Sequence, residues 1–236
     1  MGLARDIAGP QGATQASGLE DLTPPCAHVA ECWGSPDAPW NPRYDVMAMG
    51  WSLARRAEFE AGRACAARAI RAAGYAGETF VGRSGRAPVW PRGLVGSITH
   101  THGYCAAVVA EATEAISMGI DAEVIASVEP RLWRELFSPD EIARIEASPK
   151  PDRQVLAAVM FCAKEAFFKC QHPVTGLWLD FTDVEVWAAN GRFEIIDRYR
   201  TADRRLPQCG RYRISGALAL AASTWRSNPP RLQGQS

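Results

Sequence analysis

Two acidic segments that lie far apart in the sequence constrain how this chain can fold. Asp121 and Glu123 fall in the extended stretch 119–123, and residues two apart in a strand point to the same side. Glu165 falls in an amphipathic helical stretch and adds a third carboxylate if that helix faces the strand end. Three hard oxygen ligands with room for water and a phosphate group suit Mg²⁺, with Mn²⁺ as the alternative ion. The sequence therefore predicts a divalent-cation site between a strand and a helix.

The composition limits the class of protein and of partner. The chain has 236 residues, of which 47% are hydrophobic, so it can bury a substantial core in one domain or two small ones. It has 26 basic and 26 acidic residues, so no global excess of positive charge favours nucleic acid or an anionic membrane. Any anion site must therefore be local, and arginines suit a phosphorylated ligand.

The seven cysteines do not form the regularly spaced, even set that is typical of a disulfide framework. No basic and apolar leader precedes them, so we expect a cytoplasmic protein. Cys26, His28 and Cys32 leave a zinc site open, although no fourth ligand stands at a zinc-finger spacing. Cysteines that fall among small and apolar residues at helical spacing are expected in the core: Cys65, Cys162 and Cys170.

An arginine-rich helix is predicted over 51–73, with Gly74 as its stop. Arg56, Glu60 and Arg63 have the spacing of a surface salt-bridge ladder, which is the alternative to a role in anion binding. The turn-rich stretch 81–88 that follows is a weak candidate for a phosphate-binding loop, because glycines let backbone amides approach an anion.

His100 is predicted to lie in a loop before a buried strand over 104–110. A single histidine in such a place is more often structural than functional, and His100 with His102 makes a poor metal site.

The second half of the chain predicts two helices and several strands. Ser138 and Glu141 form a capping box for a helix ending near Ala147, and a second helix follows over 152–171. Hairpin strands are predicted over 183–187 and 192–196 around Asn190-Gly191, and one further strand over 213–223. Helices and strands in separate blocks indicate an α+β fold with antiparallel sheets.

Three patterns occur in a recognisable order: Gly96-Ser-Ile-Thr-His100, Gly119-Ile-Asp-Ala-Glu123 and Phe161-Cys-Ala-Lys-Glu-Ala-Phe-Phe-Lys169. Together they resemble the 4′-phosphopantetheinyl transferase superfamily, in particular its larger monomeric bacterial type, which serves polyketide, nonribosomal peptide and siderophore synthases. The resemblance implies a pseudo-twofold pair of similar α+β halves, each a small antiparallel sheet packed on a long helix. It also implies transfer of the phosphopantetheine arm of coenzyme A to a serine of an apo-acyl or peptidyl carrier protein.

The resemblance assigns roles to individual residues. The implied metal ligands are Asp121, Glu123 and Glu165. The implied contacts to coenzyme A are Arg55, Arg63, Arg83, Arg86, Thr99, His100 and Lys164. Lys164 or Lys169 is expected to stabilise the leaving oxygen, and Glu165, directly or through a metal-bound water, is expected to accept the serine proton. Within the arginine-rich helix, Arg56 is then expected to be the arginine that forms surface ion pairs.

Some positions depart from the family pattern. Phe161 stands where tryptophan is common, Ala122 cannot add a metal ligand, and the basic loop carries arginine and serine where lysines are frequent. The expected organisation is a loose segment over 1–25, a coenzyme A-binding half over 26–116, a half over 117–225 with the metal ligands and the carrier-docking surface, and a polar tail over 226–236.

The carrier surface is expected at 131–137, where arginines alternate with large apolar residues. The alternative is an amphipathic turn whose apolar side chains pack into the core. Two other functions stay open from the residues alone: a metal-dependent phosphohydrolase, and a noncatalytic protein that binds coenzyme A or a carrier domain.

Overall fold

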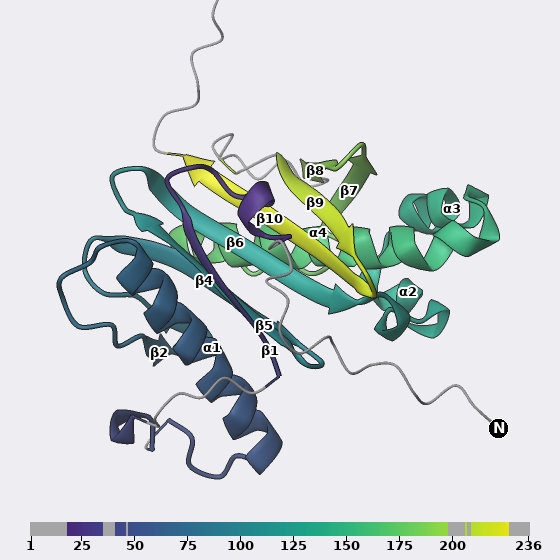
Figure 1. Cartoon of the computed structure of the whole chain (residues 1–236). Coiled ribbons are helices and arrows are strands. Elements are labelled where there is room, and N and C mark those ends of the chain that lie inside the picture. The colour runs from purple at the N-terminus through teal and green to yellow at the C-terminus, as the bar shows by residue number, and fades with distance from the viewer. Residues whose placement is uncertain (1–17, 35–40, 46, 198–205, 207–208, 227–236) are drawn as a thin grey trace, which may run out of the picture.

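Two antiparallel sheets, each with one long helix on its outer side, form the body of the protein (Figure 1). The computed structural model describes residues 18–34, 41–45, 47–197, 206 and 209–226. The first sheet has the strand order β1-β5-β4 and the second has the order β6-β10-β9-β8-β7. Helix α1 packs on the first sheet and α4 on the second, so the α+β prediction with two helix-on-sheet halves is confirmed.

Helices and strands occur in separate blocks along the described chain. The helices are α1 (Leu53–Ala72), α2 (Trp133–Leu136), α3 (Pro139–Ala147) and α4 (Lys150–Thr175). The strands are β1 (His28–Trp33), β2 (Gly82–Ser84), β3 (Ala87–Val89), β4 (Leu94–Thr101), β5 (Tyr104–Glu111), β6 (Ala115–Val124), β7 (Val184–Ala189), β8 (Arg192–Asp197), β9 (Cys209–Ser215) and β10 (Leu218–Arg226). Short 3-10 turns lie at Glu20–Leu22, Pro42–Tyr44, Ile125–Ser127 and Pro130–Leu132.

Strand β5 is buried on both faces from Tyr104 to Ala110, and its sequence is apolar over that range. Cys105, Ala107 and Val109 point toward α1, while the alternate residues point into a second core between the two sheets. That second core continues on the inner faces of β6 and β10. A strand that is buried on both faces needs an unbroken apolar run, and the prediction of a buried strand over 104–110 is confirmed.

Several local predictions agree with the structure. Helix α1 ends before Gly74, which has a φ of 69°, and the Ser138–Glu141 capping box is formed. Asn190 and Gly191 have φ values of 51° and 74°, as a tight hairpin between β7 and β8 requires. The three cysteines expected in the core are buried.

Two strand predictions were wrong. His100 lies within β4 and not in a loop, because β4 continues to Thr101 and pairs with β5 along its whole length. The single strand expected over 213–223 is two strands, β9 and β10, because Gly216 with a φ of 57° turns the chain between them. Helix α4 also extends past its predicted end, through Pro173 to the left-handed Gly176.

The N-terminal segment also differs from the expectation of a loose stretch over 1–25. Leu19 is fully buried and Leu22 is 8% exposed, and both pack into the core between the two sheets. Asp21 pairs with Arg213 at 2.7 Å, which ties this segment to β9. The remainder of that stretch, residues 1–17, and most of the predicted polar tail, residues 227–236, lie outside the described residues.

Lys164 is buried in a polar network and does not point toward the predicted site. Its Nζ lies 2.6 Å from Glu141 Oε2 and donates to the carbonyls of Leu136 at 3.0 Å and Phe181 at 2.5 Å. All three donors of the ammonium are therefore used. The role expected for Lys164 at coenzyme A and at the leaving oxygen is corrected here, because the side chain instead connects α3, α4 and the chain before β7.

Gly119 allows β6 and α4 to approach each other closely. A Cβ placed on Gly119 would overlap the Ala166 carbonyl and lie 2.6 Å from the Cys170 amide nitrogen, both of which are backbone atoms of α4. Helix backbone cannot move aside as a flexible side chain can, so only glycine fits at this crossing. The crossing brings α4 against the end of β6 that carries the acidic residues.

Within the described residues, no helix combines the length and the apolar content that crossing a membrane would require.

Gly119→Ala is expected to lower the free energy of unfolding by about 1–3 kcal/mol or more, because the added methyl group must push two backbones apart. Urea denaturation followed by circular dichroism measures this loss. Gly82→Ala is the matched control, because its nearest neighbouring atom would be an ordinary 3.5 Å away. Equal stabilities of the two variants would contradict the close approach.

Lys164→Met is expected to cost about 3–5 kcal/mol of stability, because it leaves the buried Glu141 carboxylate without its cation. Adding Glu141→Gln removes that stranded charge and should recover part of the loss. Thermal and urea unfolding of the single and double variants measure both effects. A Lys164→Met protein as stable as wild type would remove this pair from the core.

Candidate active site

Asp121 is the most constrained side chain of the predicted acidic group. It is 5% exposed, and its Oδ1 accepts hydrogen bonds from Lys169 Nζ at 2.6 Å and Thr99 Oγ1 at 3.1 Å. Its Oδ2 is buried and has no partner among the described residues. A buried carboxylate oxygen without a donor is costly, so this atom is prepared for a cation or another donor.

Hydroxyl groups of β4 hold β6 in place. Ser97 Oγ accepts from the Ile120 amide and Thr99 Oγ1 from the Ala122 amide, both at 3.1 Å. Two residues further on, Thr101 Oγ1 donates to Glu123 Oε2 at 3.3 Å. Although the two strands belong to different sheets, these bonds connect them side by side.

This arrangement corrects the role expected for Thr99. The side chain is 2% exposed and its hydroxyl is already used by Asp121 and the β6 backbone. It therefore positions an acidic residue and is not free to bind coenzyme A. Thr101, which the sequence analysis did not single out, does the same for Glu123. The alternation of hydroxyls at 97, 99 and 101 along a strand was the signal that could have indicated this role.

The three predicted carboxylates lie close enough to affect one another. Burial raises the pKa of Glu123, and the charge of Asp121 raises it further, while Ser127, Thr101 and Lys169 oppose the shift. Burial also raises the pKa of Glu165; Lys169 opposes this shift, and Asp121 and Glu123 add to it. The negative charge of this group is thus only partly compensated.

Lys169 supplies the compensating charge. Burial disfavours its ammonium, yet the carboxylates of Asp121 and Glu165 together raise its pKa above the ordinary value. It also donates to the Ile120 carbonyl at 3.3 Å. Glu165 and Lys169 are four residues apart on α4, so the helix presents both to the strand end on one face.

The donor set fits a divalent cation in its chemistry. Asp121, Glu123 and Glu165 are hard oxygen donors, and the unpartnered Asp121 Oδ2 is available. Among the described residues, however, no three His, Cys, Asp or Glu side chains are arranged as a ready metal site. In the structure the Lys169 ammonium stands next to Asp121 in the position of a counterion.

The zinc alternative near the N-terminus is not supported by the arrangement. Cys26 and His28 line one cavity of about 330 Å³ together with Glu111 and Glu114, whereas the charge interactions of Cys32 are with Cys65 and Arg68. The described part of the chain holds no ready metal site here either.

His100 lies between the acidic group and helix α1. Partial burial lowers its pKa; Glu58 and Asp121 oppose the shift, and Lys169 and Arg55 reinforce it. Charged groups of α1, α4 and β6 therefore surround one imidazole.

The arginines of α1 divide into different roles. Arg56 pairs with Asp45 at 3.2 Å and Glu60 at 3.4 Å, as expected for the surface partner. Arg63 is 9% exposed and donates to the carbonyls of Val81 at 3.0 Å and Gly82 at 3.1 Å. Burial lowers its pKa to about 10.

These contacts give Arg63 a structural task that the sequence did not indicate, because it fastens the β2–β3 hairpin to α1. Arg83 lies in that hairpin, and its charge contributes to the lowered pKa of Arg63. Arg55 and Arg86 are exposed.

The segment expected to receive a carrier packs largely into the core. Trp133 is 8% exposed and its Nε1 donates to the Val128 carbonyl at 3.3 Å, and Phe137 is 1% exposed. Arg131 and Arg134 stay on the surface, where Arg131 contacts Glu129 at 2.8 Å. The apolar residues of this segment therefore follow the alternative expectation, an amphipathic turn that packs into the core.

Comparisons with known proteins identify related sequences along most of the chain. A family model described as 4′-phosphopantetheinyl transferase N-terminal domain matches residues 51–110, and one described as 4′-phosphopantetheinyl transferase superfamily matches residues 117–220. The 4′-phosphopantetheinyl transferase Npt of Nocardia iowensis is 37% identical over 183 residues, which are 71% of this chain and 81% of that protein. The corresponding Svp protein of Streptomyces mobaraensis is 39% identical over 132 residues, 55% of this chain and 53% of that one.

One further relative by sequence and one solved structure also share similarity with this chain. Enterobactin synthase component D of Escherichia coli (strain K12) is 32% identical over 164 residues, which cover 69% of this chain and 75% of that protein. The crystal structure of Thermotoga maritima holo-[acyl-carrier-protein] synthase shares 21% identity, with a TM-score of 0.35 over 45% of this chain and 61% of that chain. The two family models and the Nocardia relative together establish that this chain belongs to the 4′-phosphopantetheinyl transferase superfamily, and that it is an enzyme that transfers phosphopantetheine to carrier proteins.

Proposed function

We propose that the chain carries out this transfer at Asp121, Glu123 and Glu165 with a bound Mg²⁺, using coenzyme A as the donor and a serine of an apo-carrier protein as the acceptor. The observation that carries the proposal is the buried, unpartnered Oδ2 of Asp121 beside two carboxylates of raised pKa. A divalent cation held there would neutralise charge that develops on the pyrophosphate. The products are holo-carrier and 3′,5′-adenosine bisphosphate.

The chain's own residues position the reactants on both sides of that ion. Lys169 holds a positive charge next to Asp121, and it would be available to a phosphate oxygen if a cation took its place at the carboxylate. Arg55, Arg83 and the free side of Arg63 supply positive charge for the nucleotide end, with His100 between the two regions.

Glu165 is the proposed acceptor for the proton of the carrier serine. The serine oxygen forms a bond to phosphorus, the bond to the bisphosphate leaving group breaks, and the proton moves to the carboxylate. Burial raises the pKa of Glu165 in the protein without a cation, and coordination of a cation would lower it, so the proton can reach this carboxylate directly or through a water molecule. Direct transfer and transfer through one water molecule remain the two routes.

The proposal includes the setting of the enzyme. We expect a cytoplasmic monomer that serves polyketide, nonribosomal peptide or siderophore carrier domains. We expect the boundary between its two halves near Ser117. Arg131 and Arg134 are the exposed part of the expected docking segment, and an acidic carrier helix would have to compete with Glu129 for Arg131.

Intact-protein mass spectrometry of an apo-acyl carrier protein, incubated with this protein, coenzyme A and Mg²⁺, tests the function directly. The expected result is a carrier heavier by one phosphopantetheine, and loss of this product when a chelator removes the metal. Cleavage of coenzyme A without modified carrier would instead indicate a phosphohydrolase. Binding of coenzyme A with no chemistry would indicate a noncatalytic protein.

Asp121→Asn and Glu165→Gln should each lower the rate of transfer at least about 100-fold, because each removes a charge from the metal site and Glu165→Gln also removes the base. Initial rates of carrier modification at saturating Mg²⁺ measure the effect. Glu146→Gln on the exposed face of α3 is the matched control and should retain full activity. Substantial activity in either site variant would refute the ligand set.

Arg55→Ala should raise the KM for coenzyme A about 10-fold or more while kcat changes little, because it removes one charge-assisted contact to a phosphate. Arg56→Ala is the control on the neighbouring position, since Arg56 already pairs with Asp45 and Glu60. With dephospho-coenzyme A the penalty for Arg55→Ala should shrink. An equal penalty with both substrates would place Arg55 away from the 3′-phosphate.

A further inference from the structure

We propose that Trp51 is a positioning residue that holds Arg55 and Arg83 together as one phosphate-binding unit. The inference rests on the proposed function, because it concerns the nucleotide end of the same substrate. The guanidinium of Arg55 lies 5.0 Å from the centre of a Trp51 ring, and that of Arg83 lies 5.1 Å from it. One arginine comes from the first turn of α1 and the other from β2, so a single side chain gathers groups from two separate elements.

Trp51 is itself fixed by its neighbours. Its ring meets Phe59 edge-on at 5.1 Å with an interplanar angle of 73°, and its amide donates to the Ala48 carbonyl at 3.1 Å. Phe59 in turn lies under the guanidinium of Arg63 at 4.3 Å. Two packed rings thus contact three guanidinium groups, of which that of Arg63 is nearly buried.

The three guanidinium groups lack acidic partners in the described part of the chain. Within the described residues, no carboxylate forms an ion pair with Arg55, Arg63 or Arg83. Other arginines of the same region do have acidic partners: Arg43 contacts Glu78, and Arg56 contacts Asp45 and Glu60. Burial lowers the pKa of Arg63, Tyr44 opposes this shift, and the nearby charge of Arg83 adds to it.

Guanidinium groups repel one another, so an arrangement that brings them together requires a compensating attraction. The electron-rich face of an aromatic ring attracts a guanidinium without neutralising it, so the charge remains available to a ligand. A phosphate monoester dianion matches such a group in charge, and arginine forks bind its oxygens in pairs. The 3′-phosphate of coenzyme A has this chemistry. Trp51 would then restrict the rotamers of two long side chains before the ligand arrives.

Replacement of Trp51 therefore provides the test, with binding of coenzyme A and dephospho-coenzyme A measured by isothermal titration calorimetry. Trp51→Leu, which keeps apolar bulk, should weaken coenzyme A binding about 5- to 30-fold through loss of two cation–π contacts. Binding of dephospho-coenzyme A should change less than about threefold, because the phosphate that the arginines hold is absent. In kinetics the same variant should raise KM and leave kcat nearly unchanged.

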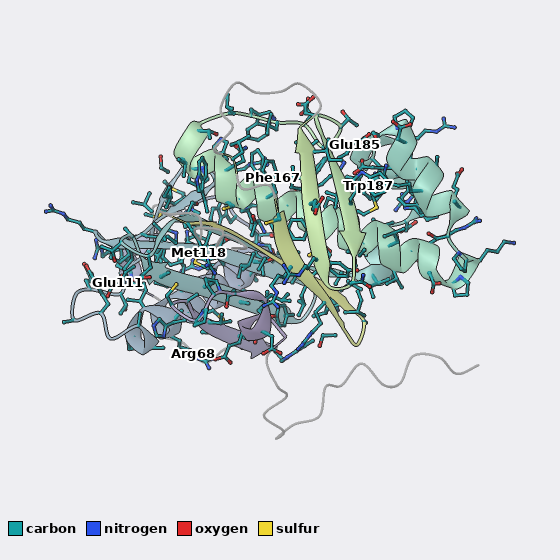
Figure 2. The ribbon with its side chains drawn as sticks, turned by 90° about the horizontal axis from the view of Figure 1, so that it is seen from above. Arg68, Glu111, Met118, Phe167, Glu185 and Trp187 are labelled. Carbon is teal, nitrogen blue, oxygen red and sulfur yellow. The ribbon has the colours of Figure 1, made fainter. Side chains whose placement is uncertain are left out.

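Trp187→Leu is the matched control, since Trp187 also lies under an arginine, Arg144, at 4.3 Å but belongs to β7 of the other half (Figure 2). It should bind coenzyme A as wild type does. A graded series, Trp51→Tyr and Trp51→Phe, keeps the proposal testable if Trp51→Leu fails to fold, because tryptophan is the best of the three rings for a cation. We expect affinity for coenzyme A to fall along that series.

Three results would overturn the proposal: unchanged coenzyme A affinity in Trp51→Leu or across the graded series, equal losses for both ligands, or a wild type that does not bind coenzyme A. Failure of the proposed function is a different result, because calorimetry does not depend on transfer. A wild type that binds coenzyme A but leaves the carrier unmodified would refute the transfer at this site and still permit the comparison of Trp51 variants.

Discussion

The contact between β6 and α4 is the constraint on which the site depends. Because position 119 is glycine, the backbone of β6 reaches the backbone of α4 near Ala166 and Cys170. Two residues further along the strand, Asp121 then meets Lys169 at 2.6 Å, and Glu165 lies within range of both acidic strand residues. A side chain at 119 would separate the strand from the helix and with them the charged groups of the candidate site.

A second layer of contacts joins the half that carries the acidic residues to the half that carries the arginines. The hydroxyls of Ser97 and Thr99 in β4 accept hydrogen bonds from backbone amides of β6. Side chains of one sheet therefore satisfy part of the backbone of a strand in the other sheet. The next residue after Thr99 is His100, which faces α1 and its charged side chains. The short motif from Gly96 to His100 is therefore both a connector and a part of the site. This double use explains why a motif with little chemistry of its own stands beside the acidic residues.

The sequence predicted more of the local structure than of the side-chain roles. The capping box at Ser138 and the Asn190-Gly191 hairpin were correct, because each is decided by residues adjacent in the chain. Thr99 and Lys164 were assigned to coenzyme A by resemblance, and both turned out to be buried and fully engaged with protein groups. Their partners, Ala122 and Glu141, lie more than twenty residues away, and no local pattern reveals such pairs.

By itself, the sequence determined the α+β class, the long helices, the acidic residues on one strand face, and the family. These follow from periodicity, turn chemistry and motif order, which are local or nearly local properties. Only the tertiary structure decided which basic side chains are paired with acidic groups of the described residues and which are not. Arg55 and Arg56 are neighbours in the chain, yet one lies over Trp51 and the other is paired with Asp45 and Glu60. Lys164 and Lys169 share one helix, yet one is enclosed by Glu141 and the other faces Asp121. The reason is physical: the role of a charge is set by which opposite charges and how much water surround it, and both are fixed only when distant segments pack together.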